Sequence, residues 1–128
     1  MELQYSFICN ATNTCKNGDL NALGIFHRLF APKFPCIHPK LTFVAHVLFH
    51  QSETGKHKIK LLCIDQDGKD IISPIDNEID IKQVNLRTNI ILEIVPLSIP
   101  KAGTYEIALA IDGRNVATNS IAVLQINK

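Results

Sequence analysis

The chain lacks several features that would point directly to a function. It has 128 residues with no tryptophan, 6% aromatic residues and a formal net charge of +1. Nucleic-acid-binding proteins that neutralise phosphates normally carry a basic excess or a basic stripe, and neither is present here. No apolar run approaches the roughly 18 residues of a membrane-spanning helix. The composition therefore predicts no nucleic-acid partner and no membrane partner.

The motifs of common catalytic sites are also missing. Six glycines are scattered singly, so no glycine-rich loop is available to bind a phosphate group. Cys36 lies close to His38, but in a proline-rich stretch without the turn that presents a nucleophile. We therefore expect no catalytic residue and no cofactor, and the chain is predicted not to be an enzyme.

Cysteine usage and the N-terminal residues bear on the compartment. Residues 1–6 lack the basic and apolar regions of a secretory signal peptide. A chain of this length buries enough surface to fold without covalent staples. We therefore expect a cytoplasmic protein in which all the thiols are free. The four cysteines, which could pair in three ways, are Cys9, Cys15, Cys36 and Cys63.

Alternation of apolar and polar side chains with a period of two recurs along the chain and predicts strands. Gly24 interrupts the second of them, which is typical of a bulge or a close backbone approach. A short return strand is expected at 71–72, ending at Pro74, and 75–85 is expected to be a connection with at most a short strand near 79–81. The main predicted strands are 3–9, 20–30, 41–50, 59–63, 90–94, 105–111 and 116–126.

Seven to nine strands with short turns predict a single all-β domain over 1–128, an immunoglobulin-like antiparallel β-sandwich. Tyr105 begins the strand that turns at Asp112-Gly113 into the last strand. Immunoglobulin-like domains often place a tyrosine there, with its hydroxyl bonded to nearby backbone; the alternative is an ordinary buried aromatic residue. The predicted core comprises Phe43, Val47, Ile59, Leu61, Tyr105, Ile107, Leu109 and Ile111.

The strand at 41–50 carries two different rows of side chains. Leu41, Phe43, Ala45, Val47 and Phe49 form an apolar row. The opposite row mixes apolar and titratable groups, which is typical of a contact face. An open sandwich also has edge strands that must be covered or paired. We therefore expect a binding module with a protein partner or a second copy, whose interaction face is formed by Val44, His46, Leu48 and His50.

A metal- or small-ligand-binding domain is the alternative. His46 and His50 lie four apart on a strand, roughly 13 Å from each other, so one metal ion would need further ligands from His57 or the 36–38 segment. The acidic run around Gly68 has two interpretations, a set of calcium ligands and an ordinary hairpin turn. The acidic residues in question are Asp65, Asp67 and Asp70.

Several segments taken in order carry a family resemblance. They are residues 3–9, 18–26, 31–39, 55–59 leading to 65–68, and 103–105 leading to 112–113. In these segments the chain resembles an uncharacterised family of small bacterial proteins, known only as a domain of unknown function. The resemblance implies a β-sandwich and a bacterial cytosolic origin, and it supplies no catalytic motif. The chain departs from the family pattern after Phe26, at His27-Arg28.

Overall fold

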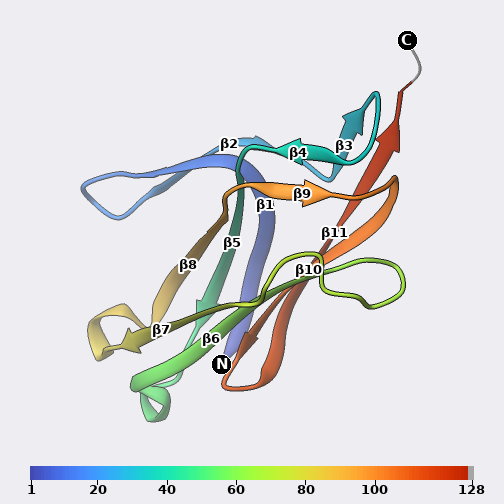
Figure 1. Cartoon of the computed structure of the whole chain (residues 1–128). Coiled ribbons are helices and arrows are strands. Elements are labelled where there is room, and N and C mark those ends of the chain that lie inside the picture. Colours follow the sequence, from blue (N-terminus) through green and yellow to red (C-terminus); the bar gives the residue numbers. More distant parts are fainter. Residues whose placement is uncertain (127–128) are drawn as a thin grey trace.

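The computed structural model describes residues 1–126, which are almost entirely β-strands and turns (Figure 1). Two short 3-10 turns, η1 (Gln51–Glu53) and η2 (Gln83–Asn85), are the helical elements of this range, so the predicted all-β class is confirmed. The strands are β1 (Glu2–Thr14), β2 (Leu20–Ile25), β3 (Arg28–Ala31), β4 (Cys36–His38), β5 (Leu41–Leu48), β6 (Gly55–Ile64), β7 (Ile75–Ile81), β8 (Arg87–Ile94), β9 (Leu97–Ile99), β10 (Gly103–Ile111) and β11 (Arg114–Gln125).

The strands form two larger sheets and one small one. One sheet has the order β2-β1-β5-β8, and the other has the order β3-β11-β10-β6-β7. Strands β4 and β9 pair separately, at the upper end of the molecule in Figure 1. All pairs are antiparallel except β3 with β11, which is parallel. The expected count of seven to nine antiparallel strands is therefore wrong: the described residues contain eleven strands and one parallel pair.

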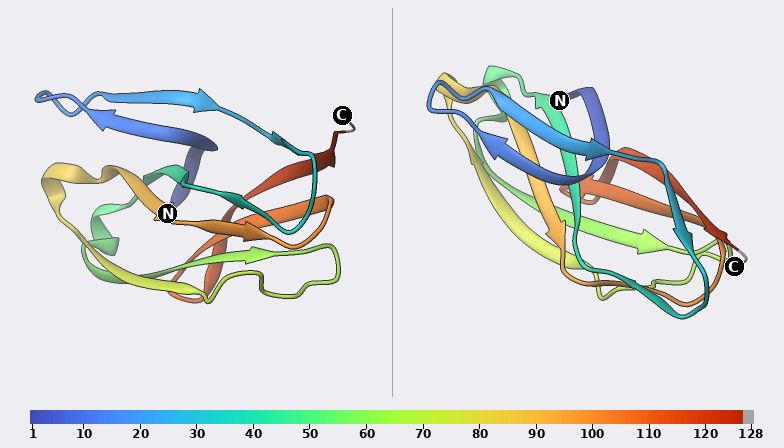
Figure 2. Two further views of the ribbon diagram at one scale, coloured as in Figure 1. Left: turned by 45° about the horizontal axis from the view of Figure 1, so that its top comes forward. Right: turned by 90° about the horizontal axis from the view of Figure 1, so that it is seen from above.

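The two larger sheets face each other across one hydrophobic core, and the left view of Figure 2 shows them as separate layers. Ile8, Phe43 and Ile90 enter this core from the four-stranded sheet, and Leu61 and Ile121 from the five-stranded sheet. The prediction of the buried set is confirmed. Each of the eight predicted core residues is at most 2% exposed: Phe43, Val47, Ile59, Leu61, Tyr105, Ile107, Leu109 and Ile111.

Three predicted segments are organised differently in the structure. Residues 20–30 are two strands in two different sheets, because the chain leaves β1 at Phe26 and joins β11 through β3. Residues 71–74 form bends, with a single backbone bond from the Ile71 N–H to the Cys63 carbonyl, so no return strand exists there. The expected connection after Pro74 is instead the full strand β7, paired along its length with β6.

A glycine contact, a turn and a tyrosine hydrogen bond bear on the expectations from the sequence. The side-chain amide of Asn10 occupies the place that a Cβ at Gly24 would fill, so a side chain, rather than the bulge or close backbone approach predicted there, accounts for this glycine. Asp112 and Gly113 both have positive φ, 52° and 81°, as a type I′ hairpin turn requires. The Tyr105 hydroxyl donates to the Lys101 carbonyl at 2.6 Å, which fixes the start of β10. Nowhere in residues 1–126 is there a helix of the length and apolar character needed to cross a membrane.

Candidate interaction surface

The outer side of the four-stranded sheet is a continuous apolar and aromatic surface. Register pairs place Tyr5 beside His46 and Phe7 beside Val44, with Asn89 and Ile91 on the other side of β5. Because paired residues project to the same side of a sheet, these rows share one face. We call this surface the apolar face and define it by Tyr5, Phe7, Val44, His46, Leu48 and Ile91.

Three of these side chains hold one another in place. The Tyr5 and His46 rings stack with centroids 4.8 Å apart and an angle of 4° between their planes. His46 Nδ1 lies 2.8 Å from Asn89 Oδ1, and the Tyr5 hydroxyl donates a longer bond of 3.4 Å to the same oxygen. An amide oxygen only accepts, so His46 must carry a proton on Nδ1. The cluster is therefore ordered without any partner.

The structure brings together three of the four residues predicted for the interaction face. His46 and Leu48 are half-buried on the outer side of β5, as expected. Val44 also projects outward but is 0% exposed, and it stands outside the core between the sheets. Phe7 and Ile91 flank it on the neighbouring strands. Val44 is therefore the buried floor of the apolar face.

His50 does not belong to the predicted row. β5 ends at Leu48, and His50 is the residue before η1. Its backbone N–H donates to Glu53 Oε1 at 2.8 Å, which fixes the turn. The alternation therefore stops before the predicted end of the strand, because the backbone leaves the sheet to form the 3-10 turn.

Residues of β1 contribute to the apolar face and were not assigned to it from the sequence. A register shift between Leu3 and Tyr5 places Tyr5 and Phe7 outward, while Ile8 points into the core. Ile25 on the edge strand β2 extends the same face beside Cys9, and its side chain is 61% exposed. The period-two signal of β1 was visible, but the side of the sheet it faces depends on pairing with β5.

The outer side of β6 and β7, at one edge of the five-stranded sheet, has the opposite character. Lysines on β6 face acidic residues on the edge strand β7, and ion pairs of 3.8 Å join Lys56 to Glu78 and Lys60 to Asp76. Three ammonium groups against three carboxylates leave this surface without net charge. We call it the charged face; its register pairs are Lys56–Asp80, Lys58–Glu78 and Lys60–Asp76.

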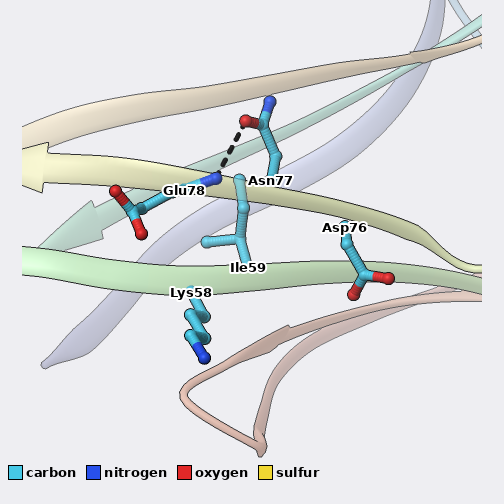
Figure 3. Close-up of a pocket in the computed structure, with 5 residues that line it drawn as sticks. All are labelled: Lys58, Ile59, Asp76, Asn77 and Glu78. Carbon is cyan, nitrogen blue, oxygen red and sulfur yellow. Dashed lines mark hydrogen bonds between the residues drawn. The ribbon is translucent and has the colours of Figure 1, made fainter.

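A shallow pocket lies on the charged face, lined by Lys58, Ile59, Asp76, Asn77 and Glu78 (Figure 3). Lys58 and Asp76 point to the same side of the strands with their charged ends apart, and Glu78 extends toward the other end of β7. Asn77 Oδ1 accepts a bond from the Glu78 N–H at 2.8 Å. A site for a small charged ligand needs polar groups that converge on one point. The pocket does not offer this arrangement.

His57 is a structural cation. Its Nδ1 lies 2.6 Å from Asp112 Oδ2, and its Nε2 lies 2.6 Å from the Glu53 carbonyl oxygen. Both partners only accept, so both bonds require the doubly protonated imidazolium. The bond to Glu53, followed by that to Asp112, raises the pKa of His57, and the bond from His57 lowers the pKa of Asp112. Both nitrogens are therefore engaged in joining β6 to η1 and to the β10–β11 turn.

Cys36 and His38 share one side of β4, with Ile37 on the other side at 67% exposure. Burial raises the pKa of the Cys36 thiol and lowers the pKa of His38. Both shifts favour the neutral forms. An activated cysteine nucleophile needs the thiolate instead, stabilised by a neighbouring positive charge. The environment of β4 therefore opposes the activation that a cysteine nucleophile requires.

The acidic run at 65–70 forms a tight turn, across which Ile64 and Asp70 make an isolated antiparallel bridge. Asp65 Oδ1 accepts the N–H groups of Lys69 and Asp67 at 2.9 Å, and these bonds lower the pKa of Asp65, the one from Lys69 most. Gly68 has a φ of +80°, as the turn requires. The turn interpretation is therefore confirmed. Across residues 1–126, no group of three or more histidine, cysteine, aspartate or glutamate side chains could hold a metal ion.

The fold and its surfaces define an all-β protein of two facing sheets, with the apolar face on the four-stranded sheet and the charged face on β6 and β7 of the other. The chain belongs to a family of unknown function (DUF6941), whose model matches residues 4–124. The resemblance to a family of unknown function is thereby confirmed over nearly the whole chain. A search of curated proteins found no match.

Proposed function

We propose that this protein is a non-catalytic protein-binding module of the bacterial cytoplasm that contacts its partner through the apolar face. The observation that carries the proposal is the ordered row of aromatic and aliphatic side chains on the outer side of β1, β5 and β8. Aromatic residues are enriched at the centre of protein interfaces, where charged residues are depleted. The apolar face has that composition, with Tyr5 45% exposed.

The scaffold that we propose is an immunoglobulin-like sandwich. Two sheets with one shared core support it, as does Tyr105, whose hydroxyl bonds to backbone four residues upstream. That bond resembles the tyrosine corner found at the start of the corresponding strand in such domains. In these scaffolds the sheets are rigid, so a partner meets a preformed surface.

Photo-crosslinking from a single position tests the interaction face. The photoreactive residue benzoylphenylalanine replaces His46 on the apolar face or, in a matched chain, Lys58 on the charged face, and the chains are irradiated in the native cell. We expect a protein adduct from position 46, lost when Leu48→Asp is added, and none from position 58. Absence of an adduct at 46, or equal adducts from both faces, would overturn the proposal. Circular dichroism verifies that each variant is folded.

The cytoplasmic location is tested through the cysteines. Cys9, Cys15, Cys36 and Cys63 are all free thiols, and burial raises the pKa of Cys63 to about 12. Freshly purified protein, denatured without reductant, should titrate as four thiols. Two thiols or none would show that the native protein meets an oxidising compartment, and this would contradict the proposed location.

A further inference from the structure

We propose that the occupant of the apolar face is a second copy of this chain, packed face to face about a two-fold axis that reverses the strand direction. This inference rests on the proposed use of that face and adds the identity of the partner. Face-to-face packing of sheets with nearly aligned strands is a common geometry in proteins. The charges and the hydrogen bonds of the face favour one particular arrangement.

The outward side chains form four successive rows across β1, β5 and β8. From β1 to β8, the first row holds Glu2, Leu48 and Arg87, the second Tyr5, His46 and Asn89, the third Phe7, Val44 and Ile91, and the fourth Cys9, Thr42 and Glu93. A two-fold axis in the plane of contact, perpendicular to the strands, places the first row over the fourth and the second over the third. The third row then meets the stacked Tyr5–His46 pair of the other copy, with Phe7 over Tyr5 and Val44 over His46.

The charges at the two ends of β8 are complementary in this arrangement. Arg87 stands at one end of β8 and Glu93 at the other, and both face outward. When the strand direction reverses, Arg87 of each copy lies over Glu93 of the other, which gives two opposite-charge contacts related by symmetry. Within one chain Glu93 already pairs with Lys40 at 3.1 Å. An axis parallel to the strands would place β8 over the uncharged strand β2 and give Arg87 no acidic partner there.

The polar groups inside the face are already satisfied. Asn89 Oδ1 accepts from His46 Nδ1 at 2.8 Å and from the Tyr5 hydroxyl at 3.4 Å, within one chain. Buried polar groups that lack partners are costly, and side chains that must be ordered on binding also reduce affinity. The Tyr5–His46–Asn89 cluster is hydrogen-bonded and ordered within one chain, so covering its rings with a second sheet avoids much of both costs.

The area of the apolar face sets the expected affinity of the dimer. Three strands about 4.8 Å apart and about eight residues of roughly 3.4 Å each give an area of roughly 400 Å². A standard interface buries about 800 Å² on each partner, and smaller ones belong to weak complexes. We therefore expect a dimer in exchange with the monomer, with its population rising over the micromolar range.

Sedimentation velocity of the purified chain from about 5 to about 500 µM tests the dimer. Arg87→Glu places like charges together twice in each dimer and should weaken dimerisation at least about tenfold. The double variant Arg87→Glu/Glu93→Lys restores opposite charges and should recover dimerisation to within about threefold. Lys33→Glu, an equal charge change at an exposed residue between β3 and β4, should leave dimerisation unchanged.

A chain that remains monomeric over the whole range overturns the dimer, as does a double variant no better than Arg87→Glu. The crosslinking described above then separates the two proposals. An adduct between position 46 and a different protein would leave the proposed function standing, whereas a monomer that also gives no adduct removes both.

Discussion

The apolar face and the charged face differ in composition, although each is the outer side of a sheet. No further layer of the chain covers either of them. On β6 and β7, lysines and carboxylates alternate with core residues and remain solvated. On β1, β5 and β8, the corresponding positions hold rings and aliphatic chains. The difference shows that the pleat fixes which residues point outward, while their chemistry decides whether the surface remains in water.

The largest effect should come from the core beneath both faces. Leu109 is 0% exposed on the inner side of β10. Leu109→Ala removes buried methylene groups and leaves a cavity, so it should cost about 2–5 kcal/mol of unfolding free energy. His46→Ala, on the outer side of β5, should cost far less in the monomer. Urea unfolding of both variants measures this, and equal midpoints would contradict the assignment of inner and outer sides.

A smaller loss of stability should distinguish the apolar face from the charged face. Val44 and Lys58 both project outward, but Val44 is 0% exposed and Lys58 is exposed. Val44→Ala should cost roughly 2 kcal/mol, at about 0.8 kcal/mol for each buried methylene. Lys58→Ala should change stability by less than about 0.5 kcal/mol. Similar unfolding midpoints at low protein concentration would mean that the apolar face does not bury Val44.

The His57 bonds predict a pH dependence. The pKa of His57 is raised on folding, so its stabilisation is complete below about 6.5, the ordinary histidine value, and is lost as pH rises through the raised value. The pKa of Asp112 is lowered, so its stabilisation is complete above about 3.9 and is lost as pH falls through the lowered value. Together they act most strongly between about pH 4 and 6.5.

His57→Gln isolates this contribution. The stability difference between wild type and His57→Gln should be largest near pH 5.5 and should shrink by pH 9, as measured by urea unfolding at each pH. A difference that grows toward pH 9 would show that the imidazolium does not hold η1 and the β10–β11 turn together.

The smallest effect concerns the charged face. The ion pair between Lys56 and Glu78 spans 3.8 Å between side chains that are mostly exposed. Lys56→Ala should cost less than about 0.5 kcal/mol, and salt near 1 M should erase most of that difference. Unfolding midpoints at low and high salt measure it. A loss of unfolding free energy above about 1 kcal/mol would mean that the ion pairs of the charged face stabilise the sheet, rather than only keeping its outer side polar.

The alternation of apolar and polar residues was sufficient to predict a strand where its two sides differ strongly in polarity. The row from Leu41 to Phe49 was predicted correctly because its apolar period continues without interruption. Strand β7 was missed because aspartate and glutamate have low β-propensity, although isoleucines recur at 75, 79 and 81. Its acidic residues are compatible with a strand because lysines on β6 stand opposite them, and that pairing is information from outside the segment.

The candidate surface was predictable in part for the same reason. The outward direction of His46 and Leu48 follows from the strand itself. The burial of Val44 depends on Phe7 and Ile91, which reach it from strands far away in the sequence. The division of 20–30 into β2 and β3 likewise depends on a partner, β11, near the other end of the chain. Such non-local contacts leave no periodic signal.

The parallel pair of β3 and β11 has a consequence for the order of synthesis. Strands β2, β1 and β5 lie within the first 48 residues and can pair as soon as these have left the ribosome. Arg28 pairs with Ala122, so the five-stranded sheet can close only after residue 122 has been synthesised. In the interval the apolar side chains of β1 and β5 are presented on both surfaces of an incomplete sheet. The growing chain is therefore most vulnerable to aggregation before β11 emerges.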